Sequence, residues 1–349
     1  MTLERGRLLC AFSATTVLLV TVIAQGTASA HPPSGIVVDE QGNVFFLRHA
    51  APQLIHVDPS GKLTGHRLAH DGKSPSRSHR MAGDDEGNLY VFGVGHSFWK
   101  IVDPGMESQS IVPIVYKNVP LPMASGKSLR TSSYAATPLA VDSRQALVYT
   151  QSSDFGLDGN WQIVRMDRER RAVIVAGGER GYKNGIGRAV GFRNFRNAGM
   201  AFGPDGTLYA TCAGSSIRKI TPDGHVSTLA GGPEVGYADG VGGDARFRWM
   251  VGLDVDKQGN VYVADAWNRR IRKVTAQGHV STIAGNGREA HVDGAAEEAS
   301  FVLPTGVAVG PHEEIYILDP ADHIKRNKMR VRRLTTDGRV ETFATMAYK

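Results

Sequence analysis

From about residue 34 onward, the chain consists of short apolar stretches separated by polar, glycine-rich turns. The clearest unit spans residues 252–285 and contains four such stretches, the first two joined by the turn Asp256–Asn260. Stretches this short, bounded by turn residues, predict β-strands rather than helices. Glycine supplies the positive φ that a tight turn needs. Each unit therefore predicts four short strands.

The same unit recurs along the chain, which is typical of a repeat architecture. Residues 199–231 repeat it closely, and a third copy begins at Gly306. Degraded copies begin near Gly35, Met81 and Leu139. The first turn of each unit recurs every 45 to 61 residues. The six turn positions are Asp39, Asp84, Asp142, Gly203, Asp256 and Gly310.

Six four-stranded units predict an all-β fold, a six-bladed β-propeller of four-stranded blades. A linear β-solenoid is the alternative, but its repeat is usually nearer to ~20 residues per turn. The third strand, Ile271–Thr275, does not alternate apolar and polar residues, and the pattern alone gives no reason for this. The predicted blades cover approximately residues 34–79, 80–136, 137–197, 198–251, 252–305 and 306–349.

The core of the best unit, residues 259–274, has a specific sequence, and so do the joints between units. These joints run from Ala-Gly through an Asp-Gly or Asn-Gly pair to a phenylalanine, at Phe192, Phe247 and Phe301. This sequence resembles the NHL repeat, strongly from about residue 170 to the end and more weakly toward residue 34. The resemblance implies a six-bladed propeller whose inter-blade and second-to-third-strand connections lie at one end of a central channel. It implies no function, because such propellers include enzymes, sensors and binding platforms.

The N-terminus has the pattern of a secretory signal peptide over residues 1–30. An apolar run from Leu8 to Ala24 follows two arginines, and Ala-Ser-Ala ends at Ala30. This predicts cleavage after Ala30 and a mature protein that is secreted or periplasmic. An uncleaved membrane anchor is the alternative, for which the run is short. We expect no transmembrane segment after cleavage.

Composition excludes several other classes of protein. The chain has two cysteines, of which Cys10 lies in the predicted signal, so the mature protein would contain no internal disulfide. We expect Cys212 to be a buried thiol, because no histidine partner is specified nearby. The net charge is +6, but no basic run is interleaved with aromatic residues. We therefore expect no nucleic-acid partner. We also expect the protein to be a monomer.

Three histidines, His49, His79 and His96, fall near the predicted channel mouth in the first two blades. Imidazole is a common zinc ligand, and three ligands with an open position suit metal-assisted hydrolysis or elimination. The amidating lyases resemble NHL propellers and use zinc bound by histidine, and here only His79 matches their sequence context. The alternative is that the three are solvated loop histidines.

Oxygen ligands offer a second metal prediction. Gluconolactonase-like propellers bind a divalent cation such as calcium through carboxylate and Asn oxygens, for which Asp265, Asn268 and Asp319 are candidates. The alternative is that Asp265 and Asn268 hydrogen-bond the backbone of their own loop. Either metal site would make the protein a metal-dependent hydrolase or lyase.

The long insertions favour a binding platform for a peptide, protein or glycan. An exposed pair of Phe155 and Trp161 would stack on a sugar ring or grip a peptide. The basic insertion that begins at His323 would bind anionic groups or be solvated. We place binding on the loop face, defined as the end with the inter-blade and second-to-third-strand connections, and not on the turn face with the short Gly-Asn turns. The predicted binding residues are Arg48, His49, His79, His96, Trp161, Asp265, Trp267, Asn268, Arg269, Asp319 and His323.

Overall fold

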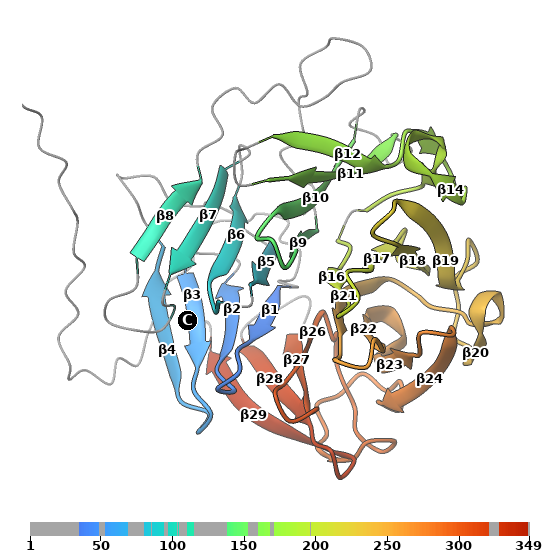
Figure 1. Ribbon diagram of the computed structural model, residues 1–349. Coiled ribbons are helices and arrows are strands. Elements are labelled where there is room, and N and C mark those ends of the chain that lie inside the picture. Colours follow the sequence, from blue (N-terminus) through green and yellow to red (C-terminus); the bar gives the residue numbers. More distant parts are fainter. Residues whose placement is uncertain are drawn as a thin grey trace, which may run out of the picture.

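Six antiparallel sheets form a ring around a central channel in the computed structural model (Figure 1). The sheets follow the order of the chain, so the first blade, in blue, lies beside the last, in red. Within the residues described, the only helical elements are the 3-10 turns η1 (Gly187–Ala189), η2 (Gly242–Asp244) and η3 (Ala266–Asn268). The prediction of an all-β, six-bladed propeller is confirmed. The structure describes residues 35–48, 53–68, 80–84, 86–93, 97–102, 104, 110–114, 138–152, 160–167, 171–195, 197–320 and 328–347.

Each blade has four consecutive strands, and the first strand of each lies nearest the channel (Figure 1). Blades 1 to 3 consist of β1 (Ile36–Val38), β2 (Val44–Arg48), β3 (Gln53–Val57) and β4 (Leu63–Arg67); β5 (Arg80–Gly83), β6 (Leu89–Gly93), β7 (Ser97–Val102) and β8 (Ser110–Ile114); and β9 (Leu139–Val141), β10 (Leu147–Ser152), β11 (Trp161–Met166) and β12 (Ala172–Ala176). Blades 4 to 6 consist of β16 (Met200–Phe202), β17 (Leu208–Cys212), β18 (Ser216–Ile220) and β19 (His225–Gly231); β21 (Met250–Val255), β22 (Val261–Asp265), β23 (Arg270–Val274) and β24 (His279–Ala284); and β26 (Gly306–Val309), β27 (Ile315–Pro320), β28 (Lys328–Leu334) and β29 (Arg339–Ala347).

Blades 4 to 6 also have a fifth strand of two residues on the outer edge. These strands are β14 (Gly185–Ile186), β20 (Gly240–Val241) and β25 (Gly294–Ala295), and each pairs with the fourth strand of its blade. Each fifth strand comes from the connection that enters the blade, so this connection covers part of the exposed sheet edge. A further parallel pair, β13 (Glu179–Arg180) with β15 (Gly191–Phe192), lies within the connection that enters blade 4.

An aspartate side chain holds the turn between the first and second strands in blades 1, 2, 3 and 5. In blade 5, Asp256 Oδ1 accepts the N–H groups of Gln258 at 3.0 Å and Asn260 at 2.7 Å, and Gly259 has a φ of +81°. Asp256 Oδ2 also accepts a hydrogen bond from the Asn260 side chain at 2.7 Å. The aspartate of this turn therefore stabilises a tight turn on the turn face.

Both faces of a blade are buried, because each blade packs between two neighbours. In blade 5, Ile271 packs in the core shared with blade 6, whereas Val274 packs in the core shared with blade 4. A strand buried on both faces need not alternate apolar and polar residues. Burial on both faces explains why Ile271 and Val274 are both apolar. It does not explain the buried Arg272 between them.

The Ala-Gly sequence at the end of the fourth strand reflects a close approach between backbones. Gly285 has a φ of +97°, and a Cβ atom there would lie 2.5 Å from the carbonyl oxygen of Arg269. Gly231 is equivalent in blade 4, with a φ of +75° and a Cβ position 2.2 Å from the carbonyl oxygen of Ser215. Only glycine fits such positions without a shift of the backbone.

Candidate ligand-binding surface on the loop face

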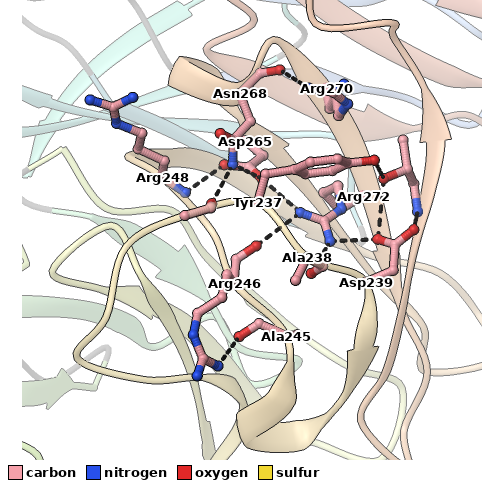
Figure 2. Close-up of polar contacts among 12 residues, drawn as sticks. Tyr237, Ala238, Asp239, Ala245, Arg246, Arg248, Asp265, Asn268, Arg270 and Arg272 are labelled. Carbon is pink, nitrogen blue, oxygen red and sulfur yellow. Dashed lines mark hydrogen bonds and ion pairs between the residues drawn. The ribbon is translucent and has the colours of Figure 1, made fainter.

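A fully buried arginine in the third strand organises the connection that enters each of blades 4, 5 and 6. In blade 5, Arg272 Nη2 donates to Asp239 Oδ1 at 2.5 Å and to the carbonyl oxygen of Ala238 at 2.7 Å. Its Nη1 donates to Asp265 Oδ2 at 2.8 Å and to the carbonyl oxygen of Arg246 at 3.2 Å. Figure 2 shows the Arg272 guanidinium at the centre of these contacts. The arginine therefore fixes the incoming loop and the end of β22 together.

Blade 6 repeats this arrangement. Arg332 Nη2 donates to Asp293 Oδ1 at 2.6 Å and Nη1 lies 3.5 Å from Asp319 Oδ2. The Asp319 carboxylate also accepts the N–H groups of Val302 and Leu303, at 3.1 and 2.8 Å. A phenylalanine ring lies beside each arginine, with the Arg332 Cζ 5.3 Å from the ring centroid of Phe301. The two blades thus use the same pairing of charges.

Blade 4 has the arginine but neither carboxylate. Arg218 Nη2 donates to Asn184 Oδ1 at 3.0 Å and to the carbonyl oxygen of Lys183 at 3.1 Å, and Nη1 donates to the carbonyl oxygen of Gly191. Asn184 replaces the loop aspartate, and Cys212 replaces the aspartate at the end of the second strand. Cys212 is fully buried, as predicted, and burial raises the pKa of its thiol. Burial likewise lowers the pKa of Arg218.

The predicted oxygen ligands for a cation are already engaged. Asp265 and Asp319 have 0% exposure, and burial raises the pKa of Asp265. Asp265 accepts the Arg248 N–H at 2.8 Å, and Asn268 donates to Asp265 at 2.8 Å and to the Gly236 carbonyl oxygen at 2.7 Å. Asp265 and Asn268 thus bond each other, but their backbone partners belong to the connection that enters blade 5 and not to their own loop, where the sequence had placed them. The cation site stays a prediction.

The described part of the chain has no group of three or more His, Cys, Asp or Glu side chains placed to hold a metal ion. The prediction of a metal held by His49, His79 and His96 falls outside the described residues and stays a prediction. Phe155 and His323 also lie outside them.

Two other predicted binding residues are buried. Trp161 has only 3% exposure, and its ring packs edge-on against Phe195 with a centroid distance of 6.1 Å. The prediction that Trp161 is exposed is therefore wrong, because β11 turns this side chain into the core between blades 3 and 4. Arg48 is also buried, and its guanidinium donates to Gln53 Oε1 at 3.1 Å. Neither side chain is presented to a ligand.

Among the residues that the structure describes, the most exposed aromatic side chains, Tyr237 and Trp267, belong to blade 5 and the connection that enters it. We call Arg248, Trp249 and Trp267 the tryptophan platform. Trp267 is 51% exposed, and its ring centroid lies 5.2 Å from that of Trp249. The Arg248 guanidinium lies 5.2 Å from the centroid of the Trp267 ring. Figure 2 shows the Arg248 side chain pointing away from the buried Arg272 network. The sequence singled out Trp267 but not its two partners.

A backbone hydrogen bond and packing on a buried apolar cluster hold the platform in place. The backbone N–H of Trp267 donates to the backbone carbonyl oxygen of Arg248 at 3.2 Å. This hydrogen bond joins the two connections that carry the platform. Trp249 has a φ of +56°, a conformation that costs a non-glycine residue ~1–3 kcal/mol. It packs on the buried side chains of Val251, Ala266, Val302 and Leu303. Rings fixed in this way lose little freedom when a ligand stacks on them.

Arg269 stands at the edge of the platform. It has a φ of +54° and its guanidinium forms an ion pair with Glu289, which belongs to the connection that enters blade 6. This pair ties the blade 5 loop to the next connection. Arg269 therefore shapes the platform's rim.

The central channel forms a concavity of about 950 Å³. Its walls are formed largely by the first strands of the blades. Asp254 of β21 lies on this wall, where its Oδ2 accepts the N–H of Val309 from blade 6 at 2.8 Å. Burial, with the nearby Asp256 charge as a smaller cause, raises the pKa of Asp254 to about 6.

Comparison with known proteins supports the repeat and the fold. No family model matches the chain. NHL repeat-containing protein 2 of Gallus gallus is 30% identical over 121 residues, which are 31% of this chain and 17% of that protein. The chain spans 17% or less of the length of the first curated relatives that it matches.

Solved structures of low identity share the propeller fold. An auxiliary nutrient binding protein from Bacteroides ovatus aligns with a TM-score of 0.62 and 16% identity, covering 88% of this chain and 68% of that one. A virginiamycin B lyase from Staphylococcus aureus aligns with a TM-score of 0.50 and 15% identity, covering 91% and 84%. At such identities the likeness concerns the fold alone. No helix in the described residues is long and apolar enough to cross a membrane.

Proposed function

We propose that this chain, which is an NHL-repeat β-propeller, binds a peptide, protein or glycan on its loop face. The observation that carries the proposal is the tryptophan platform, because an exposed tryptophan on a rigid base is a typical anchor for a ligand. The flat ring of Trp267 suits stacking against the apolar face of a sugar or a side chain of a peptide. Arg248 adds a donor beside it.

We favour binding over hydrolysis at this face because its two buried carboxylates, Asp265 and Asp319, already accept hydrogen bonds. Asp265 and Asp319 accept hydrogen bonds from arginine or backbone N–H groups, which leaves them without the freedom to act as general base or cation ligand. A propeller of the same fold is a nutrient-binding protein, which is consistent with a role in recognition. A metal-dependent reaction at His49, His79 and His96 stays a separate prediction.

Replacing Trp267 with alanine is expected to weaken ligand binding by ~2 kcal/mol, about thirtyfold in Kd. A panel of soluble peptides and oligosaccharides is first screened against the purified protein through its tryptophan fluorescence. The Kd of each hit is then measured for the wild type and the variant. Lys257→Ala, on the exposed turn face, is the matched control and should leave the Kd unchanged. An equal loss in both variants, or no loss in Trp267→Ala, contradicts a site on the platform.

We also propose that the protein is exported and that the mature chain begins at His31. The proposal rests on the sequence alone, because residues 1–30 lie outside the described part of the chain. The expected result is a mature protein whose intact mass lacks residues 1–30, recovered from outside the cytoplasm of the expressing cell. A recovered mass that still includes Met1 to Ala30 contradicts it.

A further inference from the structure

Arg248 is the charged group of the tryptophan platform, and its guanidinium lies beside an exposed ring. Its Cζ is 5.2 Å from the centroid of the Trp267 ring, and its side chain is exposed. In the described part of the chain, this guanidinium has a ring contact but no hydrogen bond or ion pair. A guanidinium above a ring keeps its N–H donors, because they lie in its own plane. The platform therefore combines an aromatic ring with a fork of donors that a ligand can reach.

The carboxylates near the platform are paired with other arginines. Glu234 pairs with Arg246 at 3.2 Å, and Glu289 pairs with Arg269. The two carboxylates of the buried arginine network in blade 5 are held by that arginine. The positive charge of Arg248 is therefore not balanced by any of these four acids. A negatively charged group on a ligand would complement it.

The combination of Arg248 and Trp267 is particular to blade 5 among the three most regular units. The equivalent residues of the other two units, in the same order, are Arg193 and Gly214 in blade 4 and Val302 and Ala321 in blade 6. Neither of these units has an arginine and an aromatic ring together. Building a blade of this repeat therefore does not require the pair, which leaves binding as a reason for it.

Exposed apolar side chains lie in the connection beside the platform. Val235 and Tyr237 are 63% and 48% exposed. Backbone bonds hold this connection against the platform, because the N–H of Gly236 donates to the Phe247 carbonyl oxygen at 3.0 Å and the Asn268 side chain donates to the Gly236 carbonyl oxygen at 2.7 Å. An exposed valine suits an apolar side chain of a peptide better than the hydroxyl groups of a sugar. This surface therefore favours a peptide over a glycan.

We propose that the tryptophan platform, together with Val235, docks an acidic peptide segment of a partner protein. A glutamate or aspartate of that segment pairs with Arg248, and a neighbouring apolar side chain packs on Trp267. A guanidinium and a carboxylate form paired hydrogen bonds, and the ring beside them excludes water from one side of the pair. Tryptophan, tyrosine and arginine are also the residues that contribute most at protein interfaces. This inference rests on the proposed function, because it names the class of ligand for the same surface.

The test measures the binding of labelled synthetic peptides to the full chain by fluorescence anisotropy, at neutral pH and constant ionic strength. Each capped peptide contains glutamate beside leucine and phenylalanine, and has a twin with glutamine in place of glutamate. We expect each acidic peptide that binds to do so about tenfold more tightly than its twin, and Arg248→Gln to abolish this difference. Arg339→Gln removes the same charge from an exposed position in blade 6 and should leave the difference unchanged.

A charge reversal at the same position gives a second readout. Arg248→Glu should bind a lysine twin of each peptide more tightly than the glutamate peptide, because the charge preference of the surface is inverted. Circular dichroism of each variant checks that the substitution of this exposed side chain leaves the fold intact. Equal affinity of the wild type for acidic peptides and their glutamine twins overturns the proposal. An equal loss in Arg248→Gln and Arg339→Gln overturns it as well, and so does an unchanged preference for glutamate in Arg248→Glu.

Trp267→Ala separates the failure of this inference from the failure of the proposed function. If acidic and neutral peptides bind the wild type equally and both are lost in Trp267→Ala, the platform is a binding site and the charge argument is wrong. If Trp267→Ala leaves the affinity for the acidic peptides unchanged, the platform itself is not the site and both proposals fail. Oligogalacturonate tests the acidic glycan alternative. Its binding through Arg248, in protein that binds none of the acidic peptides, overturns the peptide as the ligand.

Discussion

Replacing Arg272 with methionine is expected to lower the free energy of unfolding by about 3 to 5 kcal/mol. The substitution leaves Asp265 buried without its guanidinium partner, and leaves the carbonyl oxygens of Ala238 and Arg246 without their donor. A buried carboxylate without a balancing charge is far more costly than the loss of one exposed ion pair. Chemical denaturation of the wild type and the variant at pH 7 measures the difference.

The matched control is Arg270→Met on the same strand. Arg270 is only part-buried, and it contacts the carbonyl oxygens of Asn268 and Asn286 and the ring of Tyr237 without neutralising a buried acid. Its loss should cost about 1 kcal/mol. Adding Asp265→Asn to Arg272→Met should recover part of the loss, because the stranded charge is removed. Equal costs for the two arginine variants, or no recovery in the double variant, would refute the charge argument.

The fold was predictable because a repeat supplies many weak signals that agree with one another. Each turn is stabilised by its own residues, as Asp256, Gly259 and Asn260 show, so the local sequence is enough to place it. Six such turns at similar spacing then fix the number of blades, without knowledge of any contact between distant residues. The blade count follows from local chemistry repeated along the chain.

The buried arginines were not predicted, although a signal was present. Arg218, Arg272 and Arg332 occupy the same position of three units, and an asparagine or aspartate precedes a matching glycine in each incoming connection, at Gly185, Gly240 and Gly294. An arginine in a strand is ordinarily assigned to the solvent face, since arginine is rarely buried without partners. Here the partners come from a connection about 30 residues earlier in the chain, such as Asp239 for Arg272. Only the closed blade brings the two together.

The binding residues were predicted less well for the same reason. Trp161 follows a long insertion, which favours exposure, but Phe192 and Phe195 from the next connection cover the space around it. Conversely, Trp249 and Arg248 lie in an inter-blade joint with no motif of their own, and they become part of a surface only because Trp267 is bonded to that joint. Contacts between different connections are absent from any one repeat, so sequence periodicity does not reveal them.

Replacing Asp254 with asparagine is expected to change how stability depends on pH, by about 2 kcal/mol between pH 4 and pH 7.5. Asp254 has a pKa of about 6 in the folded protein against 3.8 for the ordinary group, so the folded state holds a proton that the unfolded chain has released. This stabilisation is present below pH 3.8 and is lost as the pH rises through 6. The variant has no such proton, so it should gain stability relative to the wild type as the pH rises.

The measurement is the free energy of unfolding by urea for both proteins at several pH values across this range. Asparagine keeps one acceptor for the N–H groups of Val255 and Val309, so the variant starts from an altered stability at pH 4, and only the trend of the difference with pH is diagnostic. Lys257→Gln, beside the same strand, changes the net charge by one unit without touching a carboxyl group, and its difference from the wild type should stay level. If the difference in the free energy of unfolding between Asp254→Asn and the wild type also stays constant with pH, the channel wall does not hold this carboxyl in its protonated form near pH 5. A rising difference in Asp254→Asn alone would locate a pH-sensitive contact between blades 5 and 6 at this single side chain.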